Sequence, residues 1–284
     1  MKTKIHLVGG GFYDSNCSSG LNQNTFVEWT KNESESNVTV HIDNALLRPV
    51  SAGPDKLSFG WLAESSSIIP RVIKQVLTNL QYYKKTYKYI FAHDYRIISR
   101  DPSFFKFTLP PARPWIQNKK IYKKTKSISF IASNKTMCKG HSFRQKVIRD
   151  TMGKVDHFGT GFKDRELPAF IEENGIRDTG KLWGLKDYMF SIAMENANYP
   201  DIFCEKITDC FATGTVPVFW GTPNIGNYFD KNGIIMLEDV DDFSKLDKNL
   251  YDSMKESIET NYKLCQEILT AEDYLFENHV KELL

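Results

Sequence analysis

The segment Tyr188–Phe229 constrains the fold more than any other part of the chain. Its first residues alternate between apolar and smaller side chains, which is typical of a buried strand. A polar loop follows, and the apolar spacing after Cys204 predicts a helix that ends at Gly214. The short apolar run Val216–Trp220 then predicts a second strand. A series of strand, loop, helix and strand is the repeating unit of a parallel sheet, so we expect an α/β domain here.

Two polar pairs lie where such a unit would bind a ligand. Glu195-Asn196 follows the first strand directly, and Glu205-Lys206 opens the helix. Ligands of open α/β sheets bind outside the carboxyl ends of the strands, so all four side chains are expected at that edge. A carboxylate suits the diol of a ribose, and a lysine at the start of a helix suits a phosphate. The pattern therefore indicates a site for a nucleotide with a diphosphate.

The sequence ENANYPDIFCEK, with ATGTVPVFWGTPN after it, resembles the donor-binding signature of the α-1,3-fucosyltransferases of glycosyltransferase family 10. That signature has an E-N pair, a loop, an E-K pair and a P-[IV]-[YVF]-[WL]-G turn. Glu195 and Glu205 stand ten residues apart, as they do in the family. The resemblance implies an α/β fold with two facing Rossmann-like domains (the GT-B architecture), the donor in the C-terminal domain and the acceptor mostly in the N-terminal one.

The activity that this resemblance implies is an inverting transfer of fucose, or a related sugar, from GDP-fucose or another GDP-sugar to a hydroxyl of a glycan acceptor. Two positions depart from the family. Cys204 replaces a threonine, and Ile202 replaces a tyrosine whose ring is absent here or is supplied by Phe203 or Tyr199. Ile202 keeps two alternatives open. One is an inverting glycosyltransferase that uses a different nucleotide sugar, and the other is a catalytically silent protein that binds a nucleotide or a glycan.

Composition excludes several other classes of protein. The chain has 284 residues, 41% of them hydrophobic, which is enough for two domains with apolar cores. A net charge of +2 gives no reason to expect a nucleic-acid partner. The apolar run near the start is too short for a secretory signal, and no run approaches the roughly 18 apolar residues of a membrane span. Five cysteines without paired spacing favour reduced thiols, so we expect a soluble, cytoplasmic protein without a membrane anchor.

The rest of the chain predicts two domains, residues 1–125 and 126–284. The first alternates strands with helices and would form the Rossmann-like domain on the acceptor side. Prolines within 109–114 and the lysine-rich segment 119–126 are interpreted as a solvated interdomain linker, because only Tyr122 interleaves the lysines as a nucleic-acid site would require. The second domain would bind the donor. Apolar residues recur at helical spacing after Asp241, so this domain is expected to end in helices.

An S-N pair that ends at Asn134, with Arg144 after it, resembles an element of the same family in which the arginine contacts the donor diphosphate. Asn134 and Arg144 are therefore assigned to donor binding, with Arg149 as the alternative arginine. Cleavage of a sugar–diphosphate bond needs stabilisation of the charge that grows on the leaving group, and an arginine with a lysine supplies it without a metal. A D-x-D sequence at Asp239 and Asp241 follows the last expected strand and reads as a solvated loop, so we expect no essential metal and no further cofactor.

Glu64 is the candidate catalytic base. An acceptor hydroxyl loses its proton as it attacks the anomeric carbon, and a carboxylate at the end of a strand can accept that proton. The setting WLAESSSIIP resembles a first-domain segment of the family in which a strand ends in a glutamate. His93 and Asp94 follow the next strand and are the alternative base. A purely structural alternative makes Glu64 an N-cap or a first-turn acid of the following helix.

Overall fold

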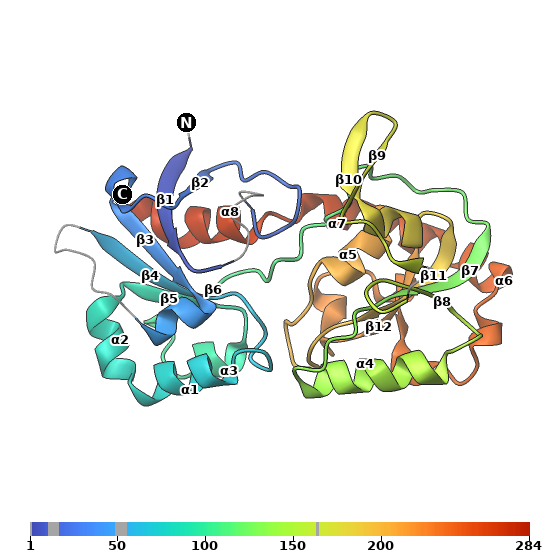
Figure 1. Cartoon of the computed structure of the whole chain (residues 1–284), viewed down its shortest axis with the longest axis horizontal. Helices are drawn as coiled ribbons and strands as arrows, with labels where there is room; N and C mark the ends of the chain where they lie inside the picture. Colours follow the sequence, from blue (N-terminus) through green and yellow to red (C-terminus); the bar gives the residue numbers. More distant parts are fainter. Residues whose placement is uncertain (1, 11–16, 49–55, 163–164) are drawn as a thin grey trace. The chain divides into compact units, whose positions relative to one another are not determined.

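The computed structural model describes residues 2–10, 17–48, 56–162 and 165–284. The chain forms two compact units, each built on a parallel sheet (Figure 1). Unit 1 comprises the residues up to Pro111 together with Pro200–Ile202 and Leu269–Leu284. Unit 2 comprises Ala112–Tyr199 and Phe203–Ile268. These units differ from the expected domains 1–125 and 126–284 at the linker and at the C-terminal end.

Unit 1 contains a six-stranded sheet with the order β2-β1-β3-β4-β5-β6, and all neighbouring strands are parallel. Its strands are β1 (Thr3–Val8), β2 (Val27–Thr30), β3 (Val38–Ile42), β4 (Leu57–Leu62), β5 (Tyr89–Ala92) and β6 (Phe105–Phe107). The helices between the later strands are α1 (Pro70–Thr78), α2 (Leu80–Thr86) and α3 (Tyr95–Ile98). Helices α1 and α2 bury Val72, Val76 and Tyr83 against one face of the sheet.

The last residues of the chain cover the other face of this sheet. Helix α8 (Ala271–Leu275), with the turns that follow it, buries Leu275 and Val280 in a core shared with β1, β3 and β4. In its first turn, the Glu272 carboxylate accepts the Ser18 backbone N–H (2.6 Å), and the Asp273 carboxylate accepts the Thr25 N–H (2.7 Å). Residues 269–284 therefore belong to unit 1 and not to the second domain in which we expected them.

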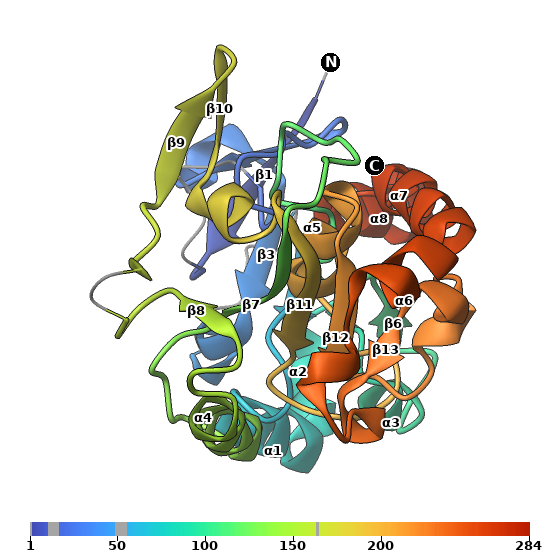
Figure 2. The ribbon, with the colours of Figure 1, turned by 90° about the vertical axis from the view of Figure 1, so that its right-hand side faces the viewer.

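Unit 2 contains a five-stranded parallel sheet with the order β13-β12-β11-β7-β8 (Figure 2). Its strands are β7 (Lys126–Ile131), β8 (Asp156–Phe158), β11 (Tyr188–Met194), β12 (Val216–Trp220) and β13 (Ile235–Met236). Its helices are α4 (Lys139–Asp150), α5 (Glu205–Ala212), α6 (Lys248–Ser253) and α7 (Lys255–Glu267). An antiparallel hairpin of β9 (Phe170–Glu173) and β10 (Ile176–Thr179) projects from the unit (Figures 1 and 2). The two cores of unit 2 lie beneath α4 and α6 and beneath α5 and the end of α7.

The lysine-rich segment 119–126 packs onto unit 2, so its interpretation as a solvated linker is wrong for Lys124. The Lys124 ammonium donates to the backbone oxygens of Thr213 (2.7 Å) and Lys186 (3.1 Å) and to Thr215 Oγ1 (2.9 Å). Burial lowers the pKa of Lys124 to about 7. Oxygen acceptors that follow α5 or precede β11 make this burial possible, and all of them are distant from Lys124 in sequence.

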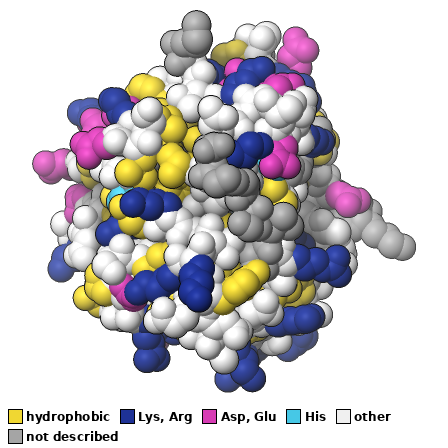
Figure 3. Space-filling model, turned by 90° about the vertical axis from the view of Figure 1, so that its left-hand side faces the viewer, with side chains coloured by type: hydrophobic (Ala, Val, Ile, Leu, Met, Phe, Trp, Pro, Cys, Tyr) yellow, Lys and Arg dark blue, Asp and Glu magenta, His cyan; other side chains and the backbone are white. Residues whose placement is uncertain are grey.

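The surface of unit 1 carries mixed chemistry. On the face shown in Figure 3, Lys and Arg side chains are interspersed with apolar and uncharged ones.

Within the described residues, none of the helices has both the length and the apolar character needed to cross a membrane.

Candidate functional site

The end of β11 and the start of α5 bring the two polar pairs of unit 2 together. Glu195 directly follows β11, and its side chain is buried. Its Oε1 atom accepts the backbone N–H of Cys204 (2.9 Å), the N-cap residue of α5. This hydrogen bond joins the end of a central strand to the beginning of a helix. It places Glu195 beside Glu205 and Lys206, in agreement with the edge predicted from the sequence.

Lys206 lies among three acceptors. Its Nζ atom is 3.3 Å from Glu195 Oε2, 2.7 Å from Cys204 Sγ and 3.9 Å from Glu205 Oε1. Burial alone would lower the pKa of Lys206, but the charges of the Glu195 and Glu205 carboxylates raise that pKa well above its usual value. Lys206 is therefore a cation at neutral pH. Its side chain is 28% exposed, which leaves it accessible to an anion.

Cys204 takes the position of the expected threonine and contacts Glu195. Its thiol donates to Glu195 Oε2 (3.1 Å). Burial, followed by the charges of Glu195 and Glu205, raises the pKa of the Cys204 thiol well above its usual value. The thiol therefore stays protonated and serves as a hydrogen-bond donor.

Arg144 is the arginine that reaches this edge. It is buried within α4, and its Nη2 atom donates to the backbone oxygen of Met194 (3.0 Å) and to Asn196 Oδ1 (3.0 Å). Arg149 is exposed in the last turn of α4. The structure thus brings Arg144, and not Arg149, to the carboxyl end of β11.

The approach of α4 to Asn196 depends on residues that the sequence analysis missed. A Cβ atom on Gly140 would lie 2.1 Å from the Asn196 backbone oxygen, so only glycine allows this contact. His141 Nε2 lies 3.0 Å from Asn196 Oδ1, the oxygen that also accepts from Arg144. Asn196 is therefore oriented by two side chains of α4.

Glu205 and Asn134 differ in how firmly they are held. Glu205 opens α5, and its Oε1 atom accepts from Lys181 Nζ (2.8 Å). Burial alone would raise the pKa of Glu205, but the charges of Lys181 and Lys206 hold it well below its usual range. Asn134 is exposed in the loop after β7, and in the described part of the chain it forms no hydrogen bond to Arg144 or Lys206.

The two candidate rings for the place of the missing tyrosine, Phe203 and Tyr199, are buried. Phe203 is 1% exposed and packs against Tyr228 and Phe229, at centroid distances of 4.7 and 5.8 Å. Tyr199 is also buried. Phe203 is a core residue of unit 2, so its ring does not stand in for the tyrosine at Ile202.

Glu64 in unit 1 lies two residues beyond β4 and is exposed. The N-cap of α1 is Ile69, and the first turn of α1 contains no acidic residue, so the structural alternative of a helix-capping role is wrong. The backbone N–H of Glu64 donates to Asp43 Oδ1 (3.1 Å), as does that of Ala63 (2.9 Å). The chain around Glu64 is thereby attached to the end of the neighbouring strand β3.

Asp43 itself was not identified from the sequence. It has a positive φ of 46°. Burial raises the pKa of Asp43 to about 7, with a further contribution from the charge of Glu64, and the two backbone N–H groups that it accepts oppose this shift. Aspartate is among the few residue types that adopt this conformation readily, but a single sequence does not reveal it. The end of β3 therefore supplies a second carboxyl group near the candidate base.

Of the alternative base His93-Asp94, the aspartate is engaged within unit 1 and the histidine is buried. Asp94 accepts the Arg96 backbone N–H (3.0 Å) as the N-cap of α3 and forms an ion pair with the Arg96 guanidinium (2.6 Å). His93 is 2% exposed, and burial lowers its pKa to about 4. His93 is therefore neutral at pH 7, and Asp94 has a structural role.

The D-x-D sequence does not form a carboxylate cage. Asp239 ends a short 3-10 turn, and both Asp239 and Asp241 are exposed. In the part of the chain that the structure describes, no three His, Cys, Asp or Glu side chains converge in a way that could hold a metal ion.

Comparison with known proteins extends these observations. Residues 121–264 match the family model described as "Glycosyltransferase family 10 (fucosyltransferase) C-term". The match covers the candidate site of unit 2 and excludes Glu64. Alpha-(1,3)-fucosyltransferase B of Drosophila melanogaster is 28% identical over 150 residues, which are 48% of this chain and 33% of that protein. GDP-fucose protein O-fucosyltransferase 3 of Gallus gallus is 31% identical over 103 residues, 35% of this chain and 22% of that protein. The chain thus spans a third or less of the length of these relatives.

Two solved structures share the fold. A crystal structure of an alpha1,3-fucosyltransferase with GDP-fucose has a TM-score of 0.51 and 14% identity, and the match covers 94% of this chain and 91% of that one. A crystal structure of TarM has a TM-score of 0.50 and 10% identity, covering 84% of this chain and 53% of that one. At these identities the likeness concerns the fold alone. It confirms the expected fold class, an α/β protein of GT-B type with a helical C-terminal end.

Proposed function

This chain belongs to glycosyltransferase family 10, the fucosyltransferases, and on that basis we propose that it transfers fucose, or a closely related sugar, with inversion from a GDP-sugar to a hydroxyl of a glycan acceptor. The observation that carries the proposal is the junction of β11 and α5. There Lys206 and Arg144, two cations on separate helices, lie beside the carboxylates Glu195 and Glu205. The cations suit the diphosphate of a nucleoside diphosphate, and a carboxylate suits its ribose hydroxyls.

The two cations would act on the leaving group. As the bond from the sugar to the diphosphate breaks, negative charge grows on the diphosphate, and fixed positive groups stabilise it. Arg144 is held by the end of β11, since its Nη2 atom donates to Met194 and Asn196. Lys206 is accessible and can exchange its contact with Glu195 for a phosphate oxygen. This arrangement supports a transfer that needs no metal ion.

The carboxylates and amides would bind the rest of the donor. Glu205 is ionised, because Lys181 and Lys206 hold its pKa low, and an ionised carboxylate accepts hydrogen bonds from the ribose hydroxyls. Asn196 and Asn134 flank the same edge of the sheet, after β11 and β7, and complete the set of donor-binding residues assigned here. Glu195 mainly orients Cys204 and Lys206.

Glu64 would be the catalytic base. An inverting transfer is a single displacement in which the acceptor oxygen attacks the anomeric carbon while the diphosphate leaves, and Glu64 takes the hydroxyl proton. Two features support this role. Glu64 is an exposed carboxylate at the carboxyl edge of the unit 1 sheet, and Asp43 holds its backbone through two hydrogen bonds to residues 63 and 64. Glu64 does not cap α1, so a helix-capping role does not account for its position.

A panel of nucleotide sugars tests the proposal. The thermal unfolding midpoint should rise with GDP-fucose, because a ligand that binds only the folded state stabilises it by about 2.7 kcal/mol at 100 times its Kd. UDP-sugars at the same concentration should leave the midpoint unchanged. Release of GDP should then require both GDP-fucose and a glycan acceptor. Stabilisation by a UDP-sugar alone would favour a glycosyltransferase that uses a different nucleotide sugar. Binding of GDP-fucose without transfer to any acceptor would favour a silent binding protein.

A further inference from the structure

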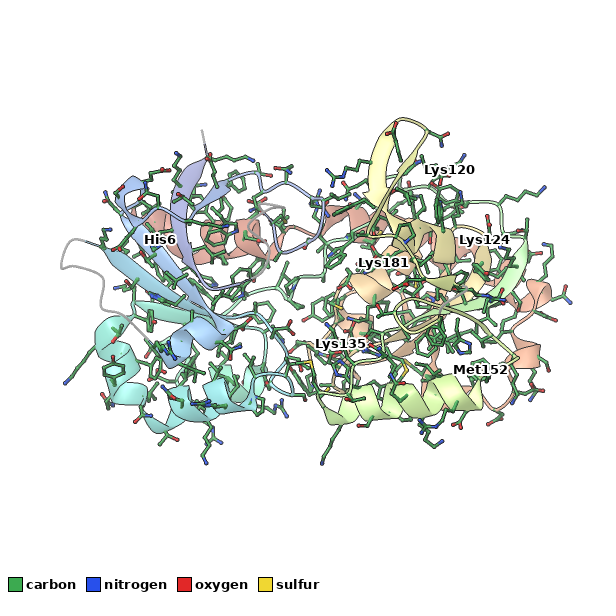
Figure 4. All side chains as sticks on the ribbon, in the orientation of Figure 1. His6, Lys120, Lys124, Lys135, Met152 and Lys181 are labelled. Carbon is green, nitrogen blue, oxygen red and sulfur yellow. The ribbon has the colours of Figure 1, made fainter. Side chains whose placement is uncertain are left out.

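Lys181 lies beside the start of α5 with its side chain 21% exposed, and the sequence analysis gave it no role. It lies in the 3-10 turn Gly180–Gly184 and reaches toward α5 (Figure 4). Its Nζ atom is 2.8 Å from Glu205 Oε1 and 3.1 Å from Asp209 Oδ2. The Lys181 ammonium also lies 4.1 Å from the centre of the Trp115 ring, in the geometry of a cation–π contact.

The surroundings fix this lysine in place. A Cβ atom on Gly180 would lie 2.0 Å from the Pro168 backbone oxygen, so glycine is required where the turn passes the loop that contains Pro168. Asp209 is 1% exposed and accepts the backbone N–H groups of Trp115 (2.7 Å) and Ile116 (3.1 Å). The carboxylate that binds Lys181 therefore also holds the aromatic ring over which Lys181 lies.

Lys181 decides which cation neutralises Glu205. The distance from Glu205 Oε1 to Lys181 is 2.8 Å, whereas that to Lys206 is 3.9 Å. Burial alone would lower the pKa of Lys181, but the charges of Glu205 and Asp209 raise it, so Lys181 is a cation. Lys181 thus belongs to a group of charged side chains around the start of α5, with Lys206, Glu195, Glu205 and Asp209.

Loss of the Lys181 ammonium would make the surroundings of Glu205 more negative, where the proposed function has an anion bind. Without this ammonium, Glu205 and Asp209 would carry negative charge with Lys206 as the next cation near Glu205. Lys206 would then be drawn toward the carboxylates and away from a ligand, and the local potential would become more negative. Both effects oppose binding of a diphosphate.

We propose that Lys181 is a positioning residue of the donor site: it holds Glu205 at the start of α5 and leaves Lys206 available to the donor diphosphate. The inference rests on the proposed function, because it assumes that the diphosphate of a GDP-sugar binds at Lys206. Lys181 itself need not contact the donor. Its effect is carried by the charge and orientation of Glu205.

Affinities for GDP and for guanosine, measured by calorimetry, test this role without an acceptor. In Lys181→Met, GDP should bind about 10- to 100-fold more weakly, whereas guanosine, which keeps the ribose contact of Glu205 but has no phosphate, should lose clearly less affinity than GDP. Lys181→Arg keeps the charge and should restore most of the GDP affinity. A lysine that only stabilises the fold predicts a lower melting temperature and equal losses for GDP and guanosine.

A matched control comes from the same unit. Lys186 forms an ion pair with Glu173 (2.7 Å), with side chains 24% and 21% exposed, and its partner belongs to the β9–β10 hairpin. Lys186→Met removes a similar half-buried ion pair and should leave the affinity for GDP unchanged. An equal loss in Lys186→Met would mean that any missing ion pair in unit 2 weakens GDP binding, and the inference would be wrong.

Two double variants keep the test decisive. Lys181→Met with Asp209→Asn removes the buried charge that would otherwise destabilise the fold, while the amide oxygen introduced at position 209 still accepts the two backbone N–H groups. This variant should still bind GDP about tenfold or more weakly, since Glu205 stays unneutralised. In Lys181→Met with Glu205→Gln, the cost of the lysine change should shrink, because the group it acts through has lost its charge.

The outcomes separate the two proposals. If the unaltered protein does not bind GDP, the proposed function fails. If it binds GDP and both Lys181→Met and the double variant with Asp209→Asn bind it equally well, the function stands and the role of Lys181 is refuted. Full additivity between the changes at Lys181 and Glu205 would also contradict a role that acts through Glu205.

Discussion

Arg144→Met is the sharpest test of the candidate donor site. The arginine is 4% exposed, and a methionine of similar length would fill much of the same space. The change removes one charge and the two 3.0 Å hydrogen bonds to Met194 and Asn196. Because a hydrogen bond to a charged group contributes about 1.5–3 kcal/mol, and the abandoned acceptors regain water only in part, the free energy of unfolding should fall by about 2–4 kcal/mol.

The effect on catalysis should be separate and measurable. An arginine that stabilises the leaving diphosphate contributes about 2–4 kcal/mol in the transition state. At 1.36 kcal/mol per factor of ten, kcat/KM for GDP-fucose should fall by roughly 30- to 900-fold. Steady-state kinetics well below the melting temperature measure this loss, and urea unfolding measures the stability. Arg144→Lys keeps the charge but loses the planar guanidinium group, so its kcat/KM should lie between those of the unaltered protein and Arg144→Met.

Arg149→Met is the matched control. Arg149 is exposed in the last turn of the same helix, so its replacement should change stability by no more than about 0.5 kcal/mol and leave kcat/KM unchanged. Normal kinetics in folded Arg144→Met, together with a large loss in Arg149→Met, would show that the sequence and the structure both point to the wrong arginine.

Three further predictions concern other groups. Glu64→Gln should retain GDP affinity but lose turnover by roughly 10²–10⁴-fold, together with the acidic limb of the pH–rate profile; near-normal rates would exclude Glu64 as the base. Turnover should persist in excess chelator, and complete loss that manganese restores would bring Asp239 and Asp241 back as ligands. Burial lowers the pKa of His41 and His93 from 6.5 to about 4, so the folded state favours their neutral forms. Below pH 6.5 the unfolded chain takes up protons on these two histidines that the folded chain does not, which lowers the free energy of unfolding as the pH falls to about 4. Asp43, whose pKa burial raises to about 7, takes up a proton in the folded chain and offsets part of this loss, so a net decline is expected. A urea midpoint that rises as the pH falls from 6.5 to 4 would contradict these pKa assignments.

The sequence predicted what depends on local pattern. Alternation and helical spacing over 188–220 gave a strand, a helix and a second strand that the structure confirms as β11, α5 and β12. The meeting of Glu195 with Lys206 followed from the rule that polar residues after parallel strands share one edge. Local information was sufficient there because the interacting groups belong to one supersecondary unit.

Contacts between distant segments were not predictable in the same way. The positive charge of Lys124 is visible in the sequence, but the sequence does not reveal that the carbonyl groups of Lys186 and Thr213 accept hydrogen bonds from it. Asp43 accepts N–H groups from residues 63 and 64, across a connection whose geometry no short pattern encodes. Lys181 likewise reads as a surface charge until the fold brings Glu205 to it. In each case the missing information was the identity of the polar partner.

The route of the C-terminal segment has a consequence for how the protein is made. During synthesis, β1, β3 and β4 emerge long before residues 269–284, which supply Leu275 and Val280 to their second face. The nascent unit 1 must therefore keep an apolar sheet face uncovered until unit 2 has been translated, which is a period of exposure to aggregation. A fragment that ends at residue 125 would keep that face uncovered permanently. A circular permutant that joins residues 269–284 ahead of β1 would allow the unit to close as soon as it is translated.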